Sequence, residues 1–256
     1  MRGFLEYVPG NSLLHRLNPI TKLLGAIIFA VACFCTSNLP FLLAMLMAGV
    51  AMAASCGMMQ QTSKLMKAVL VFSAILALIQ LLTIPSGTML IPLPWGYVGS
   101  DGAGAAATTI LRLEAAAIPL FLTFYVTKIT DMTNAAVKVL HVPYRYAFTF
   151  SSTVHFIPVF LNDMHGIMEA QTARGVEFDA GGIVNKVRLM VPLCVPLLVS
   201  SVRKTNSAAI AAEVRGFNLR TRASGYHEYP MAATDFAAFA LVVGMLAAAI
   251  AIGFIA

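Results

Sequence analysis

The stretch Ala68–Ile84 reads AVLVFSAILALIQLLTI and contains no charged side chain. A run this apolar is typical of a helix that crosses the ~30 Å hydrocarbon core of a bilayer, which takes about 20 residues. Comparable runs lie near Ile20–Thr36, Leu39–Gly57, Gly104–Val126 and Met231–Ala256. We therefore predict an all-α integral membrane protein with about five transmembrane helices and no cleavable signal peptide.

The composition supports this class. Of the 256 residues, 59% are hydrophobic and 11% are charged, whereas about 25% of the residues of a soluble domain are charged. The four cysteines form no C-x-x-C pair, so we expect them to pack as small apolar side chains. Membrane lipid is an expected partner, and nucleic acid is not.

The distribution of Lys and Arg predicts the orientation, because short cytoplasmic loops collect these residues. Sixteen of the seventeen lie in the N-terminal arm with Lys22, in the second interhelical connection or in the segment 128–230, and Arg112 is the exception. We expect a multi-pass protein of the cell membrane with a cytoplasmic N-terminus. Residues 1–127 would form the arm and four spans, 128–230 a cytoplasmic domain, and 231–256 the fifth span.

Two apolar stretches in the middle segment complicate this topology. Residues 146–161 contain His155 and Pro158, and residues 189–202 contain Pro192 and Pro196. The second stretch has fourteen residues between Arg188 and Arg203, so as a helix it reaches only about 21 Å. We expect long helices that lie against the base of the membrane. The alternative topology is a hairpin in which these two stretches cross the bilayer.

The sequence offers little support for catalysis. The phosphate-binding pattern G-x-x-x-x-G-K-[ST] is absent, and Gly99, Gly102 and Gly104 open the fourth span in an outer loop where we expect no preceding strand. His155 and His165 flank Asp163, but no spacing indicates a metal site. We therefore expect no enzyme, no bound cofactor and no bound metal.

Ionisable and small residues also lie within the spans. Arg112 and Glu114 fall in the fourth span, and we expect each to pair with a neighbouring helix or to reach the outer interface. A substrate pathway is the alternative. Small residues at helical spacing permit close helix approach, within this chain or against a partner membrane subunit; they are Gly49, Ala53, Gly57, Gly244 and Ala248.

One local pattern occurs twice in the middle segment. Ala173-Arg174-Gly175 and Val214-Arg215-Gly216 each end an apolar helical stretch with an Arg followed by Gly. Gly is a frequent helix stop, and Arg near a helix end complements the helix dipole. Two helix ends of this kind could instead present always-charged, forked donors to an acidic groove on a partner.

With these residues in view, the chain resembles the transmembrane (T) component of energy-coupling factor transporters, the EcfT/CbiQ-like family. The N-terminal arm YVPGNSLLHRLNPITK (Tyr7–Lys22) is similar to the segment before the family's first span. The paired Arg-Gly sequences are similar to its two X-Arg-X motifs. Three further segments are similar to those that lead into the family's coupling helices: Leu140–Tyr144, Phe156–Pro158 and Val199–Lys204.

The resemblance implies a scaffold subunit of an ABC-type importer for a vitamin or a metal ion. Its partners would be two cytoplasmic ATPase subunits, which use ATP, and one substrate-binding membrane subunit. Two long crossed helices would carry the coupling residues at their tips, namely Ala173, Arg174, Gly175, Val214, Arg215 and Gly216. Val214 departs from the usual Ala, and His155 from an Arg that often precedes Phe-Ile-Pro.

Two other classes of function compete with this interpretation. A self-sufficient permease would bind its own substrate and should show internal repeats and interrupted helices, and Pro119 in the fourth span is the one feature that favours it. A membrane enzyme would need clustered catalytic groups, for which Arg112 and Glu114 are too sparse. The resemblance implies that the separate substrate-binding subunit selects the transported substrate.

Overall fold

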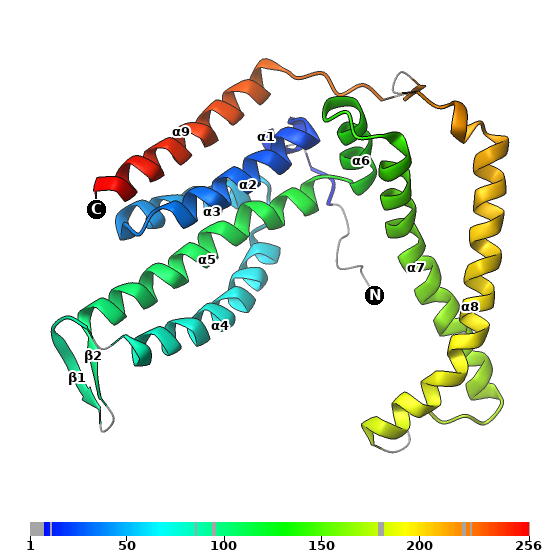
Figure 1. Ribbon diagram of the computed structural model, residues 1–256, viewed down its shortest axis with the longest axis horizontal. Coiled ribbons are helices and arrows are strands. Elements are labelled where there is room, and N and C mark those ends of the chain that lie inside the picture. Colours follow the sequence, from blue (N-terminus) through cyan, green and yellow to red (C-terminus); the bar gives the residue numbers. More distant parts are fainter. Residues whose placement is uncertain are drawn as a thin grey trace. The chain divides into compact units, whose positions relative to one another are not determined.

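The chain divides into two units. The computed structural model describes residues 8–10, 12–84, 86–93, 96–178, 182–221, 224–225 and 227–255. Residues 1–135 and 229–256 form one unit, the helical bundle, and residues 136–228 form the other, the inserted unit. Figure 1 shows the course of both units.

The bundle contains the five predicted apolar helices: α2 (Pro19–Cys35), α3 (Leu39–Ser55), α4 (Met59–Thr83), α5 (Ser100–Val126) and α9 (Ala233–Ile255), preceded by the short α1 (Leu13–Arg16). Helices α4, α5 and α9 are long and apolar enough to cross a membrane. The two others have 17 residues each, the short end of the range that spans a bilayer. The all-α membrane fold is thus confirmed.

Helix α5 is the centre of the bundle. It contacts α2, α3 and α4, and α2 in turn contacts α9, as Figure 1 shows. In its most apolar window 44% of α5 is buried, against 11% in α4 and 6% in α9. Because lipid tails are as apolar as leucine, exposed apolar faces carry no penalty in a bilayer, and close packing holds the helices together.

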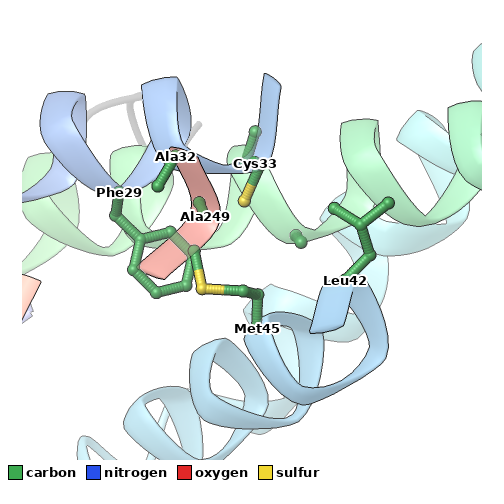
Figure 2. Packing of buried hydrophobic residues seen from close by; sticks show 8 residues of the cluster. Phe29, Ala32, Cys33, Leu42, Met45 and Ala249 are labelled. Carbon is green, nitrogen blue, oxygen red and sulfur yellow. The ribbon is translucent and has the colours of Figure 1, made fainter. Parts of the chain in front are cut away.

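Small and flexible side chains provide that packing. Phe29, Ala32 and Cys33 of α2 meet Leu42 and Met45 of α3, Ala115 and Ala116 of α5, and Ala249 of α9 (Figure 2). A second cluster joins Ala53 and Met58 to Ile118, Leu122 and Val126. A Cβ placed on Gly49 would lie 3.4 Å from Ile118 Cγ2, so α3 and α5 approach closely there. The small-residue prediction is confirmed for Gly49 and Ala53.

The starts of α2 and α9 are tied together. The Asn18 side chain caps α2 by accepting a hydrogen bond from the Ile20 amide, at 3.0 Å. Its own backbone amide donates to Asp235 Oδ1 at 2.7 Å, and Asp235 Oδ2 accepts the Ala232 amide at 2.9 Å. Helices α2 and α9 therefore begin on the same face of the bundle. The end of α5 lies there too, because the Val8 amide donates to the Tyr125 carbonyl at 3.0 Å and the Val8 carbonyl lies 3.1 Å from the ring of His15, shortly before α2.

A strand pair precedes α5, which corrects our expectation of a loop without strands. Strand β1 (Met89–Leu93) pairs antiparallel with β2 (Gly96–Gly99), and α5 begins directly afterwards at Ser100. A Cβ on Gly99 would collide with the Ser86 carbonyl oxygen, and one on Gly102 would lie 2.7 Å from that of Ile84. These glycines therefore serve a close approach between backbone segments, which their clustering in the sequence does not reveal.

The inserted unit consists mainly of α7 (Tyr144–Ala173) and α8 (Ile183–Val214), which contact each other. Helix α6 (Ile129–Val139) leads into it, and the 3-10 turn η1 (Phe217–Leu219) follows α8. With 30 and 32 residues, α7 and α8 are about 45 and 48 Å long. In the described part of the chain neither is apolar enough to count as a membrane span. The two ambiguous apolar stretches thus lie inside long helices.

Candidate functional site

Each predicted arginine lies at the end of one of the two long helices. Arg174 directly follows the last residue of α7, and Arg215 that of α8. Gly175 and Gly216 come next with φ angles of +90° and +72°, which glycine adopts without the penalty that a Cβ brings. The predicted glycine stops are confirmed. Both arginine side chains are exposed.

The end of α7 is a complete Schellman motif. The Gly175 amide donates to the Thr172 carbonyl at 2.9 Å, and the Val176 amide donates to that of Gln171 at 3.1 Å. At the end of α8 the Gly216 amide donates to Glu213 at 2.9 Å, and the Arg215 amide donates to Ala211 at 3.2 Å. These bonds fix the backbone that carries each arginine.

Aromatic side chains hold the α8 tip against the start of α7. The Phe217 ring lies 4.8 Å from the Phe148 ring and 5.5 Å from that of Tyr144, centre to centre. The Arg220 guanidinium stacks 4.8 Å above the Tyr144 ring and donates a hydrogen bond to its hydroxyl. Arg215 lines a groove of about 360 Å³ beside this cluster. Sequence reasoning missed the cluster, although Phe217 directly follows the second Arg-Gly pair.

A charged contact joins α7 to α8 ten residues before the end of each helix. Lys204 Nζ lies 2.6 Å from Asp163 Oδ1 and 2.7 Å from Oδ2, and Ser200 Oγ donates to Oδ2 at 2.9 Å. These hydrogen bonds, Lys204 first, lower the pKa of Asp163 below its ordinary value. The stabilising contribution of the ionised Asp163 carboxylate is therefore present at neutral pH, and it is lost only as the pH falls through that lowered pKa. Asp163 binds Lys204 here, and the described residues contain no metal-ligating cluster.

Arg112 and Glu114, within α5, have different environments. The Arg112 guanidinium donates to the Thr36 carbonyl at 2.8 Å and lies 5.7 Å from the centre of the Phe34 ring, so its predicted pairing is confirmed. Glu114 is 4% exposed, and neither carboxyl oxygen has a partner among the described residues. Our expectation for Glu114 was therefore wrong. Its neighbours Ala115 and Ala116 belong to the buried core, and Glu114 is enclosed with them between the helices.

The small residues of the fifth span differ from those of α3. Gly244 and Ala248 are exposed, and a Cβ on Gly244 would meet no atom within 4 Å. Gly57 lies beyond the end of α3, with φ of +70°. These three positions do not mediate close helix packing in the described structure.

Comparisons with known proteins identify the family. The model of the family described as "Cobalt transport protein" (CbiQ) matches residues 10–225, a range that includes both helix tips and four of the five apolar helices. The chain belongs to the CbiQ family.

Curated relatives agree with this membership. "Energy-coupling factor transporter transmembrane protein EcfT" of Heliobacterium modesticaldum is 30% identical over 250 residues, which cover 94% of this chain and 93% of the relative. The proteins of the same name from Brevibacillus brevis and Streptococcus equi are each 29% identical. They cover 83% and 93% of this chain, and 83% and 91% of their own lengths. This CbiQ-family chain is thus a multi-pass transmembrane component of the energy-coupling factor type.

Proposed function

We propose that this chain couples ATP binding and hydrolysis in two cytoplasmic ATPase subunits to movement of a substrate-binding membrane subunit, for uptake of a vitamin or a metal ion. The relatives are named as transmembrane proteins of energy-coupling factor transporters, and the family description names cobalt transport. In this proposal the N-terminus and the inserted unit are cytoplasmic, and ATP binds only to the partner subunits.

The observation that carries the proposal is the pair of arginine-tipped helices. An exposed guanidinium at a helix end can donate two parallel hydrogen bonds to a carboxylate, which gives both strength and direction. The Schellman motif of α7 and the aromatic cluster beside the α8 tip hold the backbone at these arginines. A rigid tip can transmit displacement, whereas a flexible loop would absorb it.

The Asp163–Lys204 contact makes the two long helices one mechanical element. It lies ten residues before the end of α7 and ten before the end of α8. A displacement of either tip is therefore transmitted to the other long helix through the Asp163–Lys204 contact. Coupling of this kind needs two discrete packings with different contacts in each, and ATP binding between the ATPases would select one of them.

Co-purification tests the proposal. The tagged chain is isolated from its own membranes in mild detergent and the bound proteins are identified by mass spectrometry, beside the Arg174→Ala/Arg215→Ala variant. Arg188→Ala/Arg203→Ala is the matched control, because it removes two exposed arginines of α8 away from the tips. We expect nucleotide-binding subunits with the unmodified chain and the control, and their loss from the tip variant. Their absence from all three samples would favour the self-sufficient permease.

A further inference from the structure

The bundle contains a half-open apolar cavity that neither the helix tips nor the family membership explains. Its volume is about 320 Å³, and α1, α2, α3, α5 and α9 all contribute to its wall. The lining is almost wholly apolar and includes Gly25, Phe29, Met52, Leu122, Leu241 and Met245. Apolar cavities hold water poorly, because they offer it no hydrogen-bond partners. An apolar molecule from the bilayer would instead gain van der Waals contacts with this wall.

One buried cation also lines the cavity. Lys22, in the first turn of α2, is 7% exposed, and its ammonium donates to the His15 carbonyl at 3.2 Å. An ammonium has three donors, so two are left for another acceptor. In the described part of the chain no carboxylate lies within ion-pair distance of Lys22, and Asp131 and Asp235 act on it only from farther away.

The dimensions of the cavity select the occupant. One turn of an α-helix, about 10 Å wide and 5.4 Å high, fills more than about 400 Å³, so a partner helix could not lie wholly inside the cavity. An extended acyl chain is much thinner. Lys22 lies in the first turn of α2, and a lysine near the end of a membrane helix typically extends to the level of the lipid headgroups.

We propose that this cavity binds a phospholipid of the surrounding bilayer, with one acyl chain in the cavity and the phosphate at the Lys22 ammonium. The lipid fills the space between α9 and helices α2 and α5, and joins the last span to the rest of the bundle. This proposal is independent of the coupling role of the helix tips.

Gly25 provides a clean test. It lines the cavity, and a Cβ added there would meet no atom within 4 Å, so Gly25→Leu adds apolar atoms at the cavity wall from a position with open space around it. Gly244→Leu is the matched control, because Gly244 is also a helical glycine with open space around it but does not line the cavity. Lys22→Met removes the ammonium and leaves the apolar wall.

The experiment is native mass spectrometry of the purified full-length chain, titrated with dioleoyl phosphatidylglycerol or with dioleoylglycerol, which has the same chains but no phosphate. We expect the unmodified chain and Gly244→Leu to bind one phosphatidylglycerol tightly and dioleoylglycerol more weakly. Gly25→Leu should weaken both about tenfold, because about a dozen carbon–carbon contacts are lost. Lys22→Met should abolish the preference for the phospholipid.

Two results would overturn the proposal. One is equal phospholipid affinity in the unmodified chain and Gly25→Leu, which would place bound lipid elsewhere on the bundle. The other is equal affinity of the unmodified chain for the two lipids, which would leave no phosphate contact. Because the two glycine variants add the same side chain, a general effect of leucine on detergent or lipid binding would appear in both.

Discussion

Lys204 Nζ lies 2.6 Å from Asp163 Oδ1 and thereby ties α8 to α7 about two thirds of the way along each helix. The pair is partly exposed, with relative exposures of 37% and 22% for the two side chains. Ion pairs at such positions add little to global stability. We therefore assign this contact to holding the two long helices in one arrangement.

Loss of that contact should loosen the two helices locally. In Asp163→Ala, hydrogen–deuterium exchange should increase at the backbone amides around residues 163 and 204, with little change in the thermal unfolding midpoint. Glu169→Ala is the control, since Glu169 is an exposed acidic residue on the same helix. Unchanged exchange in Asp163→Ala would show that apolar packing alone fixes the crossing.

Substitution of Gly216, which adopts the left-handed backbone conformation at the α8 tip, should destabilise the protein. Gly216 has φ of +72°, so Gly216→Ala should lower the free energy of unfolding by about 1–2 kcal/mol. Gly166→Ala in the interior of α7 should be neutral or stabilising by up to about 1 kcal/mol, because a Cβ meets nothing there. Thermal unfolding in detergent compares the two, and equal midpoints would contradict the tip geometry.

The buried carboxyl of Glu114 should weaken the bundle. An unsatisfied buried polar group costs about 1–3 kcal/mol, and Glu114 is 4% exposed without a partner among the described residues. We expect Glu114→Leu to raise the thermal unfolding midpoint and Arg112→Leu to lower it, since Arg112 donates to Thr36. A lower midpoint for Glu114→Leu would reveal a stabilising partner of the carboxyl.

High pH should destabilise the start of α9 through Tyr229. Burial and the nearby Asp131, which accepts the Tyr229 hydroxyl at 3.2 Å, raise the pKa of Tyr229 to about 12. Because this pKa exceeds the ordinary value of 10, the contribution is fully present below pH 10 and is lost as the pH rises through 12. The unfolding midpoint should fall less steeply over this interval in Tyr229→Phe. Parallel slopes would contradict the assignment.

The sequence predicted the helices better than their contacts. Long uncharged runs such as Ala68–Ile84 specify membrane helices through composition alone, and Gly175 and Gly216 specify helix ends because only glycine takes that backbone easily. Contacts between distant residues left no local signal. The Asp163–Lys204 pair and the stacking of Arg220 on Tyr144 join residues 41 and 76 positions apart.

The errors have the same cause. The β1–β2 pair was missed because the stretch before α5 is short and Pro-rich, and its glycines indicated a loop. We expected Glu114 to pair with a neighbouring helix or to reach the interface. Whether a residue of α5 is buried depends on which face of the helix meets the other helices, and the hydropathy of the α5 sequence does not reveal that face. Lys22 gave an orientation signal in the sequence, whereas its place in a cavity wall emerged only from the packing of the bundle.

Photocrosslinking from the helix tips tests the coupling role most directly. A photoreactive amino acid is placed at Ala173 or Val214, next to the tip arginines, and at Val202, an exposed site within α8. After irradiation of intact cells, we predict adducts with nucleotide-binding subunits from both tip positions and none from Val202. Adducts from neither tip, with the chain present in the membrane at its normal level, would contradict the coupling role.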